Sequence, residues 1–144
     1  AINSYISSDG YMLNYKLRND IPLTEQEKQF RINLDSALSK MPKYKGTLTR
    51  SVYFDDDAEL QDFLNAHTVG STIKYKGYTS TTYGERYNDT SKVEMLIMNA
   101  NKGRDISFFN PNEKEVLYER NSEFYIEKAS KASNGTYYII LREI

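Results

Sequence analysis

The sequence predicts an α+β fold in which helices come first and strands follow. Up to residue 41, apolar side chains recur at the three- and four-residue spacings of amphipathic helices. Beyond Gly46 the chain is rich in β-branched and aromatic residues grouped in short runs, which is typical of strands. This segregated order favours α+β over a parallel doubly wound sheet. Because the 144 residues contain no visible linker or repeat, we expect a single domain over residues 1–144.

Two helices are expected before Gly46. The first follows a capping pair at Ser8-Asp9 and ends before Pro22. The second begins at Thr24, whose spacing to Glu27 matches a capping box. Its apolar stripe is formed by Phe30, Leu34, Leu38 and Met41.

The second half of the chain is expected to contain one short helix and several strands. The helix begins at Asp56-Asp57, where acidic residues suit a helix N-terminus. Residues 83–91 and 101–112 are polar or contain Gly and Pro, so we expect them to be loops. Residues 72–82 are expected to form one or two strands, with a bulge or bend at Gly77. Further strands are expected at residues 47–54, 92–99, 113–117, 123–128 and 136–141.

Composition excludes several classes of site. The net charge of −1 does not provide the basic footprint of a nucleic-acid-binding protein. The absence of cysteine excludes disulfides, thiolate zinc sites and a cysteine nucleophile, and the single His67, expected at a helix end or in a loop, excludes sites that need several histidines. We therefore expect no metal. No apolar run approaches the roughly 18 residues of a membrane span. The abrupt start at Ala1 leads us to expect an excised or mature portion of a longer protein.

The pair Glu113 and Glu115 is the most informative local feature. In an extended chain both side chains project from one face, with Cα atoms roughly 6.5–7 Å apart, while Lys114 points away. Two carboxylates this close favour chemistry on a cation or on developing positive charge. The alternative is an ordinary solvated strand face in a chain with 20 acidic residues.

Two distant segments strengthen the chemical interpretation. Arg50 is the one charged residue of its expected strand, and the run from Tyr78 to Thr82 is rich in hydroxyl groups. The order of Arg50, then Ser80-Thr81-Thr82, then Glu113-Lys114-Glu115 resembles the arginine, Ser-Thr-Ser and Glu-x-Glu signature of bacterial mono-ADP-ribosyltransferases. It is most similar to binary-toxin, single-domain toxin and prophage-encoded enzymes of the arginine-specific class.

The resemblance extends over nearly the whole chain, with two departures. Leu13-Asn14 and Leu17-Arg18 are similar to the Ile-Asn…Leu-Arg helix of that family. The third position of Ser-Thr-Ser is Thr82, which keeps a hydroxyl group. Family members often carry a tyrosine four residues before the helix asparagine, where this chain has Gly10.

The resemblance implies a fold and a cofactor site. It implies N-terminal helices followed by two packed, mostly antiparallel sheets, with NAD bound as a substrate in the cleft between them. Glu115 is implied to stabilise the oxocarbenium-like ribose, Ser80 to hold Glu115, and Arg50 to grip the diphosphate. Asn14 and Arg86 are further candidates for contact with NAD. The alternatives are a structural carboxylate partner for Arg50, a backbone-bonded strand hydroxyl for Ser80 and a solvated surface side chain for Arg86.

The resemblance also implies an acceptor. Members with Glu at position 113 modify arginine and members with Gln modify asparagine, so Glu113 points to an arginine on a target protein. A carboxylate there can orient a guanidinium and help to remove its proton. Phe108 and Phe109 precede it and are candidates for contact with the target, the alternative being core packing under a loop.

The expected activity is transfer of ADP-ribose from NAD to a protein arginine, with NAD glycohydrolysis as a side reaction. We expect a monomer that is secreted or delivered into a host cell, with actin or a small GTPase as possible targets and a prophage as a possible origin. The alternatives are a weak or inactive NAD-binding or protein-interaction domain, a structural phage domain, and a two-carboxylate glycosidase. Glycosidase carboxylates usually face each other from different elements, which disfavours the last of these.

Overall fold

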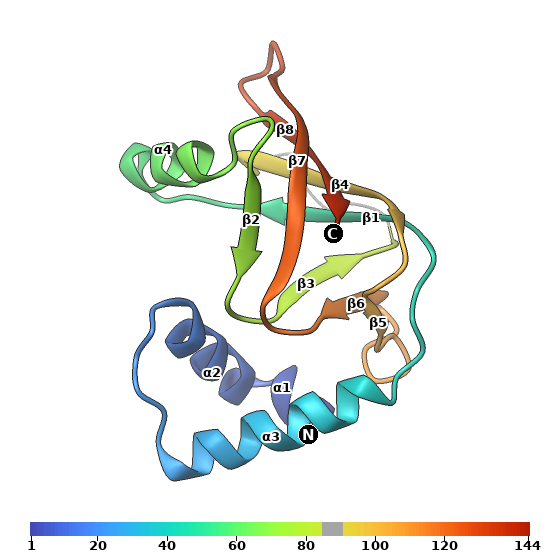
Figure 1. Cartoon of the computed structure of the whole chain (residues 1–144). Helices are drawn as coiled ribbons and strands as arrows, with labels where there is room; N and C mark the ends of the chain where they lie inside the picture. The colour runs from blue at the N-terminus through green and yellow to red at the C-terminus, as the bar shows by residue number, and fades with distance from the viewer. Residues whose placement is uncertain (85–90) are drawn as a thin grey trace.

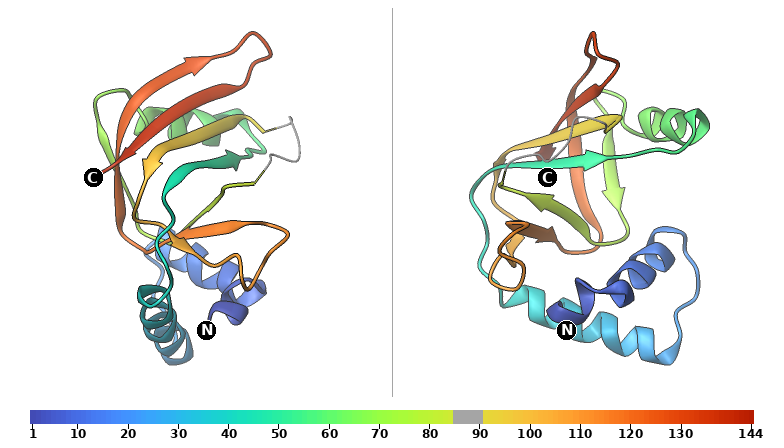
Figure 2. Two further views of the ribbon diagram at one scale, coloured as in Figure 1. Left: turned by 90° about the vertical axis from the view of Figure 1, so that its right-hand side faces the viewer. Right: turned by 180° about the vertical axis from the view of Figure 1, so that it is seen from behind.

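The computed structural model describes residues 1–84 and 91–144, and it confirms the α+β class (Figure 1). The helices are α1 (Ile2–Tyr5), α2 (Ser8–Arg18), α3 (Glu25–Ser39) and α4 (Asp57–Ala66). The strands are β1 (Gly46–Val52), β2 (Thr72–Tyr75), β3 (Thr79–Thr82), β4 (Val93–Ala100), β5 (Arg104–Asp105), β6 (Glu115–Tyr118), β7 (Ser122–Lys131) and β8 (Tyr137–Glu143). Helices α1–α3 gather on one side of the strands, while α4 lies apart from them beside β2 (Figures 1 and 2).

Local capping chemistry sets the helix starts. The capping box is confirmed: the Thr24 N–H donates to Glu27 Oε1 over 2.9 Å, and the Glu27 N–H donates to Thr24 Oγ1 over 3.2 Å. Helix α2 is capped one residue earlier than expected, since the Ser7 hydroxyl accepts from the Asp9 N–H. The sequence did not predict α1, because four residues are too few to show a periodicity.

The strands form one continuous sheet in the order β2-β7-β8-β4-β1-β3-β6-β5. We expected two packed sheets, and this detail is corrected. Strand β1 pairs with β4 along its length but with β3 through the single register pair Thr49↔Thr82. This short junction attaches β3, β6 and β5 to one side of β1. On the other side, β2 and β7 follow β4 and β8 in the strand order and run across the direction of β1 and β4 (Figure 1). All pairings are antiparallel except that of β4 with β8.

Two apolar cores flank strand β6. Its alternate side chains Val116 and Tyr118 enter the core enclosed by the bent sheet, whereas Leu117 enters the core between the sheet and helices α1–α3. Glu115 shares the face of Leu117 because strand side chains repeat every two residues. The first residue of β6 therefore projects on the side where the N-terminal helices lie.

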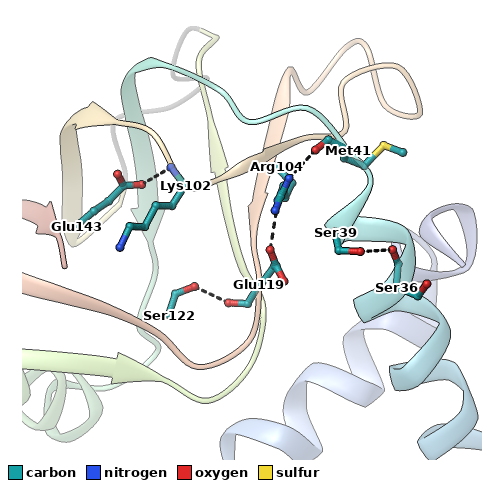
Figure 3. A network of polar contacts seen from close by, with 8 residues as sticks. All are labelled: Ser36, Ser39, Met41, Lys102, Arg104, Glu119, Ser122 and Glu143. Atoms are coloured by element: carbon teal, nitrogen blue, oxygen red, sulfur yellow. Dashed lines mark hydrogen bonds and ion pairs between the residues drawn. The ribbon is translucent and has the colours of Figure 1, made fainter.

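Arg104 of β5 ties the end of α3 to this sheet. Its Nη1 donates to the Met41 carbonyl over 2.8 Å, and its Nε lies 3.2 Å from Glu119 Oε1 (Figure 3). The Ser122 hydroxyl donates to the carbonyl of Glu119, so the turn between β6 and β7 is held by the same network. The helical and sheet portions are thereby fixed relative to each other close to β6. None of the helices in residues 1–84 and 91–144 has the length and apolar composition needed to cross a bilayer.

Candidate active site

The two glutamates lie in different backbone environments, which corrects the expected geometry. Glu115 is the first residue of β6, but Glu113 belongs to the preceding turn, and Lys114 between them has a φ of +45°. Strand alternation therefore does not explain their proximity. Both nevertheless line one cavity of about 350 Å³, together with Arg50, Ser80, Tyr53 and Asn110.

Ser80 joins the other predicted residues into one constellation. Its hydroxyl donates to Glu115 Oε2 over 2.5 Å, and its carbonyl accepts from Arg50 Nη1 over 2.8 Å. The register of β3 with β6 pairs Ser80 with Leu117 and Thr82 with Glu115, so Ser80 and Glu115 occupy the same face of neighbouring strands. Glu115 is only 8% exposed, which leaves its carboxylate few alternative partners.

Arg50 lies between the acidic and the aromatic ends of the site. Burial lowers the pKa of its guanidinium, and the neighbouring Tyr75, Tyr5 and Glu115 act in the opposite direction. Arg18 is also close enough to disfavour the charged form. An arginine keeps its charge even so, because its ordinary pKa lies above 12. The result is a half-buried cation a short distance from a buried carboxylate.

Tyr5 lies near Glu115, Arg50 and Arg18, and the sequence did not indicate this position. Burial raises the pKa of its phenol to about 12, and the nearby charge of Glu115 raises it further while Arg50 and Arg18 lower it. Its oxygen accepts from Asn14 Nδ2 over 3.2 Å, and its ring packs edge-on against Tyr78 at 5.4 Å. The phenol is therefore held beside Asn14 and Tyr78 by contacts within the protein.

Gly10 explains how Tyr5 reaches this position. A Cβ at residue 10 would lie 1.6 Å from the Tyr5 carbonyl oxygen, so only glycine lets α1 fold back onto α2. In the sequence, the only indication of this arrangement was Gly10, which departs from the family pattern. It marked a close approach between the backbones of α1 and α2.

Asn14 is fully engaged by protein groups. Its Oδ1 accepts from the Tyr78 N–H over 2.6 Å, and its Nδ2 donates to the Tyr78 carbonyl over 2.8 Å as well as to Tyr5. The expected bend at Gly77 makes room for this side chain, since a Cβ there would lie 2.2 Å from Asn14 Oδ1. The geometry therefore favours a role in holding Tyr78, two residues before Ser80, over direct contact with NAD.

A second cavity of about 430 Å³ adjoins Arg50 and has aromatic walls. Phe54, Phe63 and Tyr75 line it, with Arg18 at its edge. His67, expected at a helix end, caps α4 but is buried. Its Nδ1 is 2.7 Å from the Phe63 carbonyl and its Nε2 is 2.6 Å from the Tyr75 hydroxyl. Burial lowers the pKa of His67.

The two phenylalanines before Glu113 differ in exposure. Phe109 packs with Ile106 and Leu117 in the helix-side core, whereas Phe108 is 88% exposed. Phe108 is thus the candidate for contact with a target, and the alternative of core packing applies to Phe109. Arg86, the remaining candidate for NAD contact, lies outside the described residues. Residues 1–84 and 91–144 contain no cluster of three or more His, Asp or Glu side chains that could hold a metal ion.

The buried carboxylate of Glu115 and the cation of Arg50 line one cavity, with the exposed carboxylate of Glu113 at its edge. The sequence model of the ADP-ribosyltransferase exoenzyme family matches residues 1–144. The chain belongs to the ADP-ribosyltransferase exoenzyme family. The expected class of enzyme is confirmed at the level of this family.

Individual relatives agree with the family assignment. The exoenzyme is 29% identical over 134 residues to Mav of Mycobacterium avium, a protein named for NAD(+)–arginine ADP-ribosyltransferase activity. The alignment covers 88% of this chain but spans only 15% of the length of Mav.

Solved structures share the fold. Exoenzyme S from Pseudomonas aeruginosa, in a complex with human 14-3-3 protein beta and carba-NAD, superposes with a TM-score of 0.77 at 19% identity, covering 99% of this chain and 70% of that one. The catalytic domain of VsdC from Aeromonas hydrophila gives a TM-score of 0.75 at 14% identity, covering 97% of this chain and 96% of that one.

Proposed function

We propose that this exoenzyme transfers ADP-ribose from NAD to an arginine side chain of a target protein and hydrolyses NAD as a side reaction. The observation that carries the proposal is the linked set of Arg50, Ser80 and Glu115, with Glu113 on the same cavity. The name of Mav supports the choice of arginine as the acceptor.

NAD would extend across both cavities. Arg50 borders the two of them, which suits a group that holds the diphosphate in the middle of the dinucleotide. Arg18 stands near Arg50 and would share the phosphate charge. The nicotinamide riboside would then face Glu115, and the adenosine would lie toward the aromatic cavity of Phe54 and Phe63.

The first chemical step breaks the bond between the ribose C1′ and the nicotinamide nitrogen. The bonding pair leaves with nicotinamide, which becomes neutral, so no general acid is required. Positive charge develops on the ribose, as in glycoside cleavage. The carboxylate of Glu115 would stabilise it and orient the ribose 2′-hydroxyl, because Ser80 fixes that carboxylate before the reaction begins.

The second step forms a bond between C1′ and a guanidinium nitrogen. The acceptor loses one proton, which Glu113 would take and pass to solvent. Glu113 is exposed at the edge of the cavity, where an incoming side chain can reach it. Water that reaches C1′ first would give free ADP-ribose, which accounts for the proposed glycohydrolase reaction.

Phe108 would anchor the target protein beside Glu113. An aromatic ring this exposed on a loop next to the acceptor carboxylate is typical of a recognition residue. We propose action on a protein of a host cell, after secretion or delivery, because the family is one of exoenzymes. Actin and small GTPases are candidate targets, and a prophage is a candidate origin.

Two variants test the proposal with NAD and agmatine, a small guanidine acceptor. Glu115→Ala is expected to abolish release of nicotinamide with and without agmatine. Glu113→Gln should lose transfer to agmatine while keeping NAD hydrolysis, because only the acceptor step needs its carboxylate. Glu123→Gln, an exposed change on β7, serves as the matched control. Unchanged turnover in Glu115→Ala would exclude the mechanism, and equal loss of both reactions in Glu113→Gln would exclude the separate acceptor role.

A further inference from the structure

The hydroxyl of Thr82 bridges the end of strand β3 and the turn that carries Glu113. Thr82 Oγ1 lies 2.7 Å from the Glu113 carbonyl and 3.2 Å from the Lys114 carbonyl, and it accepts from the Gly84 N–H over 2.9 Å. A hydroxyl has one hydrogen to donate, so the shorter contact to Glu113 is the main bond. One side chain thus connects two segments about thirty residues apart in the sequence.

The turn it holds is conformationally unfavourable. Lys114 has a φ of +45°, a left-handed conformation that costs a lysine about 1–2 kcal/mol. Such a conformation persists where surrounding contacts favour it. Here the Tyr83 N–H donates to the Lys114 carbonyl over 3.2 Å, and Gly84 leaves just enough room for the Lys114 stem, since an added Cβ would lie 3.1 Å from Lys114 Cδ.

The two glutamates consequently depend on different supports. Glu115 is held by the β3–β6 ladder and by the Ser80 hydroxyl. Glu113 lies before the first ladder pair, Thr82↔Glu115, so its backbone is positioned by the turn contacts alone among those described for residues 1–84 and 91–144.

We infer that Thr82 is a positioning residue that fixes Glu113 for the acceptor step through this hydroxyl bridge, hereafter the Thr82 latch. The inference rests on the proposed function, since it assigns Glu113 to the acceptor step. It also gives a role to the threonine that departs from the Ser-Thr-Ser pattern. Thr82 touches neither reacting group through its hydroxyl, because both acceptors and the donor are backbone atoms.

Loss of the Thr82 latch should affect transfer and NAD hydrolysis differently. Loss of the bond to the Glu113 carbonyl would displace Glu113 but leave Glu115, Ser80 and Arg50 in place. Cleavage of the C1′–N bond would continue, while the guanidinium would lose the carboxylate that accepts its proton. More of the activated ribose would then be captured by water.

The experiment compares transfer to agmatine with NAD hydrolysis in Thr82→Val, Thr82→Ser and wild type. We expect the transfer-to-hydrolysis ratio to fall about fivefold to tenfold in Thr82→Val, the effect of one lost hydrogen bond, and to recover in Thr82→Ser. Ser122→Ala is the control. Its hydroxyl donates to the Glu119 carbonyl over 2.6 Å in the turn between β6 and β7, outside the cavity of Glu113 and Glu115, so its loss should lower thermal stability without changing the ratio.

Each result bears on a distinct claim. If Thr82→Val keeps the wild-type ratio, or loses both reactions equally, the inference is wrong while the proposed function stands. If wild type catalyses neither reaction, the proposed function fails and the inference fails with it. If Thr82→Val does not fold, Thr82→Ala removes the same hydroxyl with less bulk and takes its place in the comparison.

Discussion

Replacing Ser80 by alanine tests the central hydrogen bond of the site. The change removes a 2.5 Å bond from a hydroxyl to the carboxylate of Glu115, which is only 8% exposed. Hydrogen bonds to a charged group contribute about 1.5–3 kcal/mol. If that stabilisation is realised in the transition state, kcat for NAD cleavage should fall by about 10- to 150-fold. The Ser80 carbonyl that contacts Arg50 remains, so KM for NAD should change little.

The assay is release of nicotinamide over a range of NAD concentrations, so that kcat and KM are obtained separately. Ser80→Thr keeps the hydroxyl on a strand residue and should retain most of the activity. A kcat within twofold of wild type in Ser80→Ala would show that the hydroxyl does not prepare Glu115 for catalysis. A large rise in KM with unchanged kcat would assign Ser80 to substrate binding instead.

Two further perturbations follow from buried contacts. Gly10→Ala should displace α1, because the new Cβ would lie 1.6 Å from the Tyr5 carbonyl oxygen, and we expect a loss of about 1–3 kcal/mol in stability together with a raised KM for NAD. A loss of stability without any change in KM would contradict a role for Tyr5 in binding NAD. The pKa of His67 is lowered by burial, so the unfolded chain binds a proton more readily, and stability should decline as the pH falls below about 6.5. The variant His67→Gln should show a flatter dependence of the melting temperature between pH 7 and pH 5, and an unchanged slope would contradict the assignment.

Local sequence chemistry was sufficient for elements that are stabilised by neighbouring residues. The capping box of Thr24 and Glu27 joins residues three apart, and its bonds form as expected. Residues 115–117 form part of a strand as expected, and its alternation sends Val116 and Leu117 into different cores. These features depend on rotamers and backbone groups within one turn or one strand, which a sequence specifies directly.

The sequence was less informative where geometry depends on distant contacts. Strand periodicity suggested that Glu113 and Glu115 share a strand face, but the left-handed Lys114 places Glu113 in a turn instead. The single sheet likewise follows from one register pair, Thr49↔Thr82, which no local pattern predicts.

The order of Arg50, Ser80 and Glu115 along the chain is the sequence's support for the proposed chemistry, because each side chain type matches one requirement of NAD cleavage. The tertiary structure alone decided that Tyr5 lies near Glu115 and Arg50, that Asn14 holds Tyr78 across 64 residues, and that a threonine hydroxyl supports the turn of Glu113. The reason is physical. The chemical character of a catalytic group is given by its residue type, which can be read from the sequence. Its position is set by bonds between segments that meet only after the chain has folded.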